Sequence, residues 1–152
     1  MPDAPPRRRL RLIISVLALI GVAWYVFVPP GPPSNLGLQV DRLSPCPSSP
    51  NCVSSFETGE ARIEPLAFTG SASDAVKRLL TTLEAMEDAT IILHDERYVH
   101  CEFRTPLLRF VDDVEFLVAE TQIHVRSASR RGHSDLGTNR KRVEEIRSRF
   151  ER

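Results

Sequence analysis

The chain has 152 residues, of which 41% are hydrophobic, and its 20 Lys and Arg residues balance its 20 Asp and Glu residues. That length suits one small domain. Residues 1–28 carry a net charge of +3 and residues 29–152 a net charge of −3, so most of the chain is mildly acidic and has no broad electrostatic reason to bind nucleic acid.

The N-terminal segment carries four arginines, Arg7, Arg8, Arg9 and Arg11, and then no charge from residue 12 to residue 28. At about 1.5 Å of rise per residue, the uncharged part gives roughly 26 Å of helix, close to the hydrocarbon thickness of a bilayer. We therefore expect a basic cytoplasmic tail over residues 1–11 and a transmembrane anchor over residues 12–28. The arginines favour an inner (plasma) membrane location with the C-terminal domain periplasmic or extracytoplasmic. A cleaved secretory signal is the alternative, but it normally has a shorter apolar run and a small-residue cleavage site.

A Pro-rich segment follows, and we expect residues 29–45 to form a stiff, extended linker. Cys46 and Cys52 then bracket a short prolyl turn that can bring the two sulfur atoms together. A structural disulfide, which persists outside the cytoplasm, and two reduced thiols both remain open. Metal ligation is disfavoured because no second pair of ligands has a recognisable spacing. We expect no metal and no cofactor.

The remaining elements follow from hydrophobic periodicity. Residues 73–87 and 138–150 repeat apolar side chains at helical spacing, and residues 90–94, 98–104, 111–118 and 121–128 have the composition or alternation of strands. A further strand near residues 62–68 completes the pattern. The predicted class is α+β: an antiparallel sheet of four to five strands with two helices packed on one face, preceded by a single N-terminal transmembrane helix. Residues 46–152 form the exported domain.

The two predicted strands, residues 111–118 and 121–128, are separated by two residues, which indicates a hairpin that turns around residues 119–120. This register places Glu115 opposite His124 and Asp113 opposite Arg126, so the polar face is complementary in charge. A slip of one residue would move every side chain to the other face.

Polar chemistry is concentrated between the last strand and the last helix, where residues 126–142 hold three Ser, one Thr, two Gly and six basic residues. Arginines beside a helix N-terminus favour an anion such as phosphate or carboxylate. The candidate ligand-binding residues are Asp112, Asp113, Arg126, Ser127, Ser129, Arg130, His133, Asp135, Asn139 and Arg140. The structural alternative is that Asp112 or Asp113 pairs with Arg126 or Arg130, while Ser134, Asp135 or Asn139 caps the helix.

A catalytic alternative uses His133 or His124 with Asp135 or Glu115, because paired imidazole and carboxylate groups can transfer protons. No nucleophile elbow, metal-protease His pair or phosphate-binding glycine loop accompanies these residues. The sequence therefore identifies no catalytic residues, and the absence of these motifs favours a protein that is not an enzyme.

Three ordered blocks carry a family resemblance: Cys-Pro-Ser-Ser-Pro-Asn-Cys at residues 46–52, Phe-Val-Asp-Asp-Val-Glu-Phe at residues 110–116, and His-Ser-Asp-Leu-Gly-Thr-Asn-Arg-Lys-Arg at residues 133–142. With these blocks the chain resembles the domain-of-unknown-function family 1499 over residues 46–150. The resemblance implies one autonomous domain, commonly behind an export signal or a membrane span, and supplies no catalytic residue. The family often has an aromatic residue where this chain has His133, which argues against His133 as a catalytic base.

The sequence as a whole therefore predicts a single-pass membrane protein whose exported domain is a non-enzymatic binding or scaffold module of the cell envelope. Its expected partners are the membrane and an anionic small molecule or an envelope protein, and not nucleic acid. The alternative function is that of a hydrolase or transferase using the histidine and carboxylate pairs named above.

Overall fold

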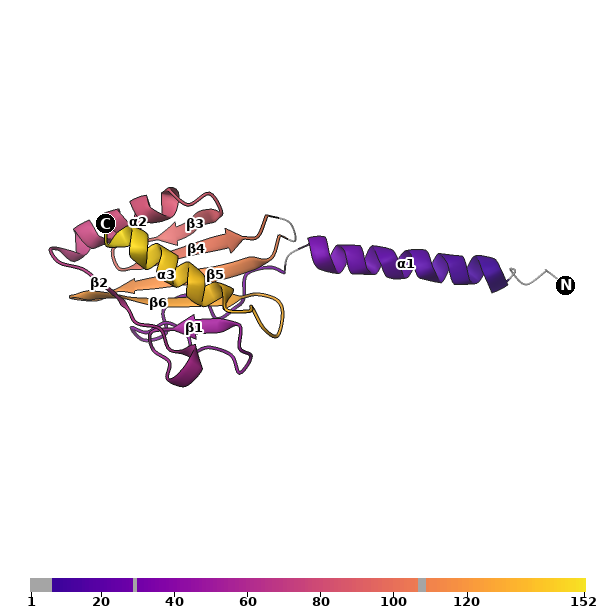
Figure 1. The fold of residues 1–152 in the computed structure, drawn as a ribbon, viewed down its shortest axis with the longest axis horizontal. Coiled ribbons are helices and arrows are strands. Elements are labelled where there is room, and N and C mark those ends of the chain that lie inside the picture. The colour runs from indigo at the N-terminus through magenta and orange to yellow at the C-terminus, as the bar shows by residue number, and fades with distance from the viewer. Residues whose placement is uncertain (1–6, 29, 107–108) are drawn as a thin grey trace.

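The computed structural model describes residues 7–28, 30–106 and 109–152. Helix α1 (Arg7–Phe27) extends away from a domain in which α2 (Ala72–Glu84) and α3 (Thr138–Phe150) cover one face of a sheet (Figure 1). The strands are β1 (Cys52–Ser54), β2 (Leu66–Ala67), β3 (Ala89–His94), β4 (Tyr98–Arg104), β5 (Val111–Val118) and β6 (Gln122–Ser129), with a 3-10 turn at Gly59–Ala61. The α+β class is thus correct. Residues 1–6 of the expected tail and Pro29 of the expected linker lie outside the described residues.

The expected transmembrane anchor over residues 12–28 is wrong. Within the described part of the chain, no helix combines the length and the apolarity needed to cross a membrane. Helix α1 begins at Arg7, so its first turns carry arginines, and its uncharged part, residues 12–27, gives about 24 Å of helix. A hydrocarbon core is about 30 Å thick and usually takes about 20 apolar residues.

Within the described residues, the sheet has six antiparallel strands in the order β1-β6-β5-β4-β3, and β2 also pairs with β6. The expected number was four to five. The difference comes mainly from β1, whose three residues pair with the end of β6. Three residues are too few to show an alternating pattern in the sequence. This strand forms because β6 provides the edge with which it pairs.

The predicted hairpin register is also wrong, by two residues. Glu115 lies opposite Arg126 and Leu117 opposite His124, and the Ala119 amide donates to the Gln122 carbonyl at 2.9 Å, so the turn is centred one residue later than expected. A shift of two leaves every side chain on its predicted face, since the pleat repeats every two residues. The alternation of apolar and polar residues therefore predicts the face of each side chain but is compatible with two registers. The position of the turn and the Glu115–Arg126 pair distinguish the two registers.

The apolar core lies between the sheet and the two helices. Phe103, Phe116 and Val125 point from β4, β5 and β6 toward Leu79 of α2 and Ile146 of α3, and all five are fully buried. Burial of such side chains is worth about 1.5–3 kcal/mol each. Helix α3 has the predicted bounds, and α2 ends three residues earlier than expected.

Strand β3 forms one open edge of the sheet. Its pairing with β4 is interrupted by a bulge between Ile91 and Leu93, and the side chains of Ile92 and Leu93 are exposed. A bulge inserts an unpaired residue and increases the local twist.

The face of the sheet opposite α2 and α3 is crossed by the segment that the sequence suggested as a linker. Leu43 is buried against Tyr98 and Leu117 of the sheet, and the Gly37 amide donates to Glu115 Oε1 at 2.8 Å. We call residues 30–41, which precede this anchor at Leu43, the strap. The polar face of the sheet is therefore covered.

Candidate ligand-binding surface at the start of α3

The ten predicted site residues come from β5, β6, the loop that follows β6 and the start of α3, but they do not converge on one cavity. The pleat divides those on the strands between two faces. Asp112, Ser127 and Ser129 share the face of Phe103 and Val114, toward α3, whereas Asp113 and Arg126 share the face of Glu102 and Glu115, toward the strap. The candidates therefore form two separate groups.

The group toward α3 attaches that helix to the sheet. Asn139 is fully buried; its Oδ1 accepts a hydrogen bond from Ser127 Oγ at 2.5 Å, and its Nδ2 donates to Ser129 Oγ and to the Asn51 carbonyl, both at 3.0 Å. Asp112 forms an ion pair with Arg142 at 2.6 Å. These polar groups are satisfied internally, so they position α3 and the disulfide loop.

The group toward the strap is a buried charge cluster centred on Asp113. Arg130 Nε donates to Asp113 Oδ2 at 2.7 Å and Arg130 Nη2 to Glu102 Oε1 at 2.5 Å, while His100 Nε2 lies 2.8 Å from Asp113 Oδ1. Burial alone would raise the pKa of Asp113, but the hydrogen bonds from Arg130 and His100 outweigh burial and lower it. His100 and Glu102 were not among the predicted site residues, although the alternation in residues 98–104 places them on this face.

Glu115 is a further buried carboxylate on this face, beside Asp113 and Glu102. Arg126 Nη1 donates to its Oε2 at 3.0 Å, and the Tyr98 hydroxyl donates to its Oε1 at 2.7 Å. Burial and the hydrogen bond to Glu115 raise the pKa of Tyr98. Arg126 is 3% exposed, and within the described residues its Nε has no hydrogen-bond partner.

The catalytic alternative uses His133 or His124 with Asp135 or Glu115. In the structure Glu115 pairs with Arg126, and His124, which lies opposite Leu117 across the hairpin, has other partners. His124 Nδ1 lies 3.1 Å from Ser55 Oγ, and the imidazole stacks on Phe56 with 4.1 Å between ring centroids. Ser55 Oγ also accepts the Val125 amide at 3.0 Å. Burial, with a smaller contribution from the Arg42 charge, lowers the pKa of His124. Gln122 Nε2 lies 3.2 Å from His124 Nε2, so both nitrogens of the imidazole have a polar neighbour within hydrogen-bond distance.

At the start of α3, Asp135 occupies the position that an anion would take. Its carboxylate accepts the Gly137 amide at 3.0 Å and the Asn139 amide at 2.8 Å. Burial opposes the charged form, but these amide hydrogen bonds outweigh it and lower the pKa of Asp135. The neighbouring Leu136 has a left-handed backbone (φ 54°) and is 89% exposed, and His133 is exposed on the same loop.

Two hollows flank this loop and share Ser134 and Asp135 in their walls. The first, of about 440 Å³, is lined by Tyr25, Thr105, Phe110, Asp112, Ser129, Arg131, Gly132, Leu136 and Thr138 in addition. The second, of about 360 Å³, is lined mainly by the loop between the disulfide-bonded Cys46 and Cys52 and by Glu60, Ala61, Gly137 and Arg140. The disulfide loop and the α3 loop, far apart in sequence, meet at the second hollow, and we call the two hollows together the concave surface.

One arginine stands beside each hollow without an acidic partner. Arg131 bonds to the carbonyls of Tyr25 and Val28 at the end of α1 and lies over the Tyr25 ring. Arg140 Nη2 donates to the carbonyls of Glu60 and Arg62, both at 2.7 Å. Among residues 7–28, 30–106 and 109–152, no carboxylate lies within ion-pair distance of either guanidinium. The two positive charges are therefore not neutralised locally.

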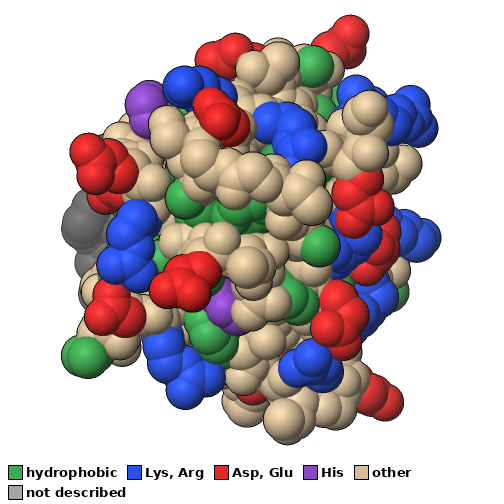
Figure 2. Space-filling model, turned by 90° about the vertical axis from the view of Figure 1, so that its left-hand side faces the viewer, with side chains coloured by type: hydrophobic (Ala, Val, Ile, Leu, Met, Phe, Trp, Pro, Cys, Tyr) green, Lys and Arg blue, Asp and Glu red, His purple; other side chains and the backbone are tan. Residues whose placement is uncertain are grey.

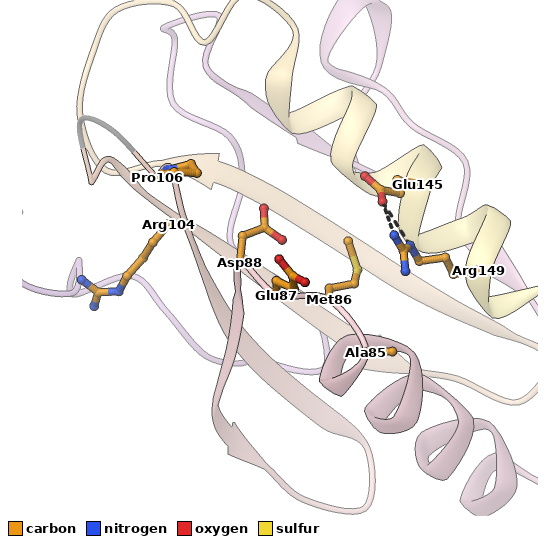
Figure 3. Close-up of a pocket in the computed structure, with 8 residues that line it drawn as sticks. All are labelled: Ala85, Met86, Glu87, Asp88, Arg104, Pro106, Glu145 and Arg149. Carbon is orange, nitrogen blue, oxygen red and sulfur yellow. Dashed lines mark hydrogen bonds and ion pairs between the residues drawn. The ribbon is translucent and has the colours of Figure 1, made fainter.

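A larger hollow, of about 730 Å³, lies between the end of α2, the start of β3 and α3 (Figure 3). Glu145 and Arg149 in its wall pair with each other, and Arg104 points away from Asp88. The end of the molecule farthest from α1 shows acidic and basic side chains interspersed (Figure 2). No group of three potential metal ligands occurs in the part of the chain that the structure describes. The surface beside Arg131 and Arg140 is the stronger candidate for a ligand.

The chain belongs to the DUF1499 family, described as a protein of unknown function, which it matches over residues 42–150. No curated protein matches the chain. The matched range contains the sheet, α2, α3 and both loops of the concave surface, and it begins after the strap.

Proposed function

We propose that the domain is a non-enzymatic binding module and that its concave surface at the start of α3 recognises an anionic ligand. The observation that carries the proposal is the pair of guanidinium groups, Arg131 and Arg140, one beside each hollow and both without a carboxylate partner. An uncompensated, partly buried guanidinium gains from a phosphate or carboxylate because the charge-assisted hydrogen bonds are strong and bidentate.

The lining of the first hollow indicates which kind of anion the surface would prefer. Phe110 and Leu136 contribute apolar surface, and Thr105, Ser134 and Thr138 contribute hydroxyl groups. A ligand with an acidic group and an apolar part fits such walls, since pockets of this kind obtain their area from apolar contact and their orientation from a few polar groups. Non-enzymatic binding is favoured over acid–base chemistry because Asp113, Glu115 and Asp135 are held in ion pairs or amide hydrogen bonds.

The test is thermal shift and calorimetric titration with phosphate, an aliphatic carboxylate and a phosphate ester. We expect at least one anion to raise the melting temperature, and Arg131→Ala or Arg140→Ala to weaken its binding about tenfold, as expected from the loss of a charge-assisted hydrogen bond. Lys141→Ala is the matched control, because it removes one positive charge from the exposed side of the same helix turn. Equal effects of all three variants, or no shift with any anion, would contradict the proposal.

We also propose that the domain works outside the reducing cytoplasm. The support is the disulfide between Cys46 and Cys52, in a loop that lines the second hollow. Cys101 is buried and unpaired, and burial raises the pKa of its thiol. We expect maleimide to label one cysteine per chain in protein denatured directly from cells without reductant, and three after reduction. Labelling of three before reduction would overturn this location.

A further inference from the structure

The strap is held to the domain by few contacts. Toward the sheet, the Gly37 amide donates to Glu115, Arg130 Nη1 donates to the Pro30 carbonyl at 3.3 Å, and Asp41 meets Arg97 in an exposed pair at 3.3 Å. Next to the strap, the buried Ser44 Oγ donates to the Asn35 carbonyl at 2.6 Å and accepts from Gln39 Nε2 at 2.9 Å. Most strap side chains are exposed, including Leu38 and Val40. Segments with few buried contacts open locally at low free energy.

The turn at the end of the strap has an unfavourable backbone conformation, which destabilises the position of the strap on the sheet. Gln39 and Arg42 exchange backbone hydrogen bonds of 2.8 and 3.2 Å across a two-residue turn, whose central residues, Val40 and Asp41, have φ values of 49° and 60°. A β-branched residue in the left-handed region is an outlier with a free-energy cost, because its Cβ crowds the following carbonyl there. Val40 is 96% exposed, so no packing offsets this cost.

The surface beneath the strap carries buried polar groups that the strap satisfies incompletely. Glu115 Oε1 receives the Gly37 amide, and Arg130 meets one carbonyl, but Arg126 Nε has no partner within the described residues although Arg126 is 3% exposed. A buried donor without a partner has lost its hydrogen bonds to water and gained none in return, which destabilises the covered state. A ligand that also brings an acceptor to Arg126 would satisfy this face better than the strap does.

We infer that the face of the sheet opposite α2 and α3 is a peptide-binding surface, which the strap occupies in cis and from which an extended segment of a partner polypeptide displaces it. The family match begins at residue 42, after the strap, so the face belongs to the family domain and the cover does not. The strap contacts this face through a backbone amide, which donates to Glu115, and a backbone carbonyl, which accepts from Arg130. These backbone groups indicate that the ligand is a polypeptide. A Pro- and Gly-rich chain such as the strap is extended before it binds, which lowers the entropy lost on binding.

The experiment uses the full chain and a fluorescein-labelled peptide with the sequence of residues 30–41, followed by fluorescence polarisation. In the unsubstituted protein the strap competes at an effective concentration of about millimolar. Gly37→Pro in the protein removes the amide that Glu115 accepts, and Pro cannot adopt the φ of 97° at this position. We expect the peptide to bind this variant at least tenfold more tightly than the unsubstituted protein.

Two matched controls accompany the measurement. Gly31→Pro in the protein introduces proline at an exposed strap position without a positive φ, and should leave peptide binding unchanged. A peptide carrying Gly37→Pro lacks the amide for Glu115 and should bind the opened protein at least tenfold more weakly. Equal binding of the two peptides, or no binding of either, overturns the inference.

Hydrogen exchange of the unsubstituted protein gives a second, independent outcome. We expect the Gly37 amide to exchange at least a hundredfold faster than the amides of β5, because the strap opens without the sheet. Exchange as slow as in β5, or a Gly37→Pro protein that does not fold, would show that the strap is an integral part of the fold and overturns the inference. Neither result bears on Arg131 or Arg140, so the two proposals fail separately.

Discussion

Asp113 is the residue with the largest share in the buried charge cluster, since both of its oxygens accept hydrogen bonds from Arg130 and one also meets His100. Removing one partner of a buried ion pair leaves the others without compensation and costs about 3–5 kcal/mol. The cluster therefore makes the domain sensitive to single substitutions on a face that contributes only a small apolar cluster, Leu43 with Tyr98 and Leu117.

We expect Asp113→Asn to lower the free energy of unfolding by about 3–5 kcal/mol, measured by urea denaturation followed by circular dichroism. Because the pKa of Asp113 in the folded protein lies below its ordinary value of 3.8, its stabilisation is complete above about pH 4 and is lost as the pH falls through the folded pKa. The variant should therefore show a smaller loss of stability between pH 4 and pH 2.

The exposed Asp88→Asn is the control and should change the free energy of unfolding by less than about 0.5 kcal/mol. An Asp113→Asn protein as stable as the Asp88→Asn protein would contradict the assignment of Asp113 to a buried ion pair.

Among the elements, the start of α3 combines a structural role with the proposed binding role. Asp135 satisfies the amides of Gly137 and Asn139, which would otherwise be free to bind an anion. The cap and an external anion therefore compete for one group of donors. This competition accounts for Arg131 and Arg140, and not the helix amides, being the groups available to a ligand.

We expect Asp135→Ala to lower the free energy of unfolding by about 1 kcal/mol, as for other lost caps, and at the same time to strengthen the binding of phosphate. Asp135→Asn can still accept an amide and should have a smaller effect on both. Urea denaturation and calorimetric titration measure the two quantities. Weaker phosphate binding by Asp135→Ala would place the anion away from this helix.

The β5–β6 hairpin shows what a sequence can decide at this scale. Alternation of apolar and charged residues identified both strands and the face of every side chain. It could not separate registers that differ by two residues, because both keep the faces intact. The observed register brings Glu115 opposite Arg126, and that choice depends on the turn and on the buried pair, which a local pattern does not show.

At the scale of the whole molecule, the sequence predicted the class, the sheet face covered by helices and the bounds of α3. It did not predict that residues 30–43 lie on the polar face of the sheet, because proline-rich composition indicates an extended chain and not its contacts. The buried charge cluster was not predicted for the same reason. In the sequence His100 and Glu102 are expected to face solvent, and only the strap makes them buried. The helix α1 was predicted, but not its arginine-containing start.

The interrupted pairing in β3 has a consequence for solubility. A regular border strand with free amides and carbonyls is a template on which another polypeptide can add, and repetition of that step leads to fibres. The extra residue between Ile91 and Leu93 breaks this template where two large apolar side chains face solvent. Deleting Ile92 would restore an uninterrupted border, and the protein would then be liable to self-association at concentrations where the native chain stays dispersed.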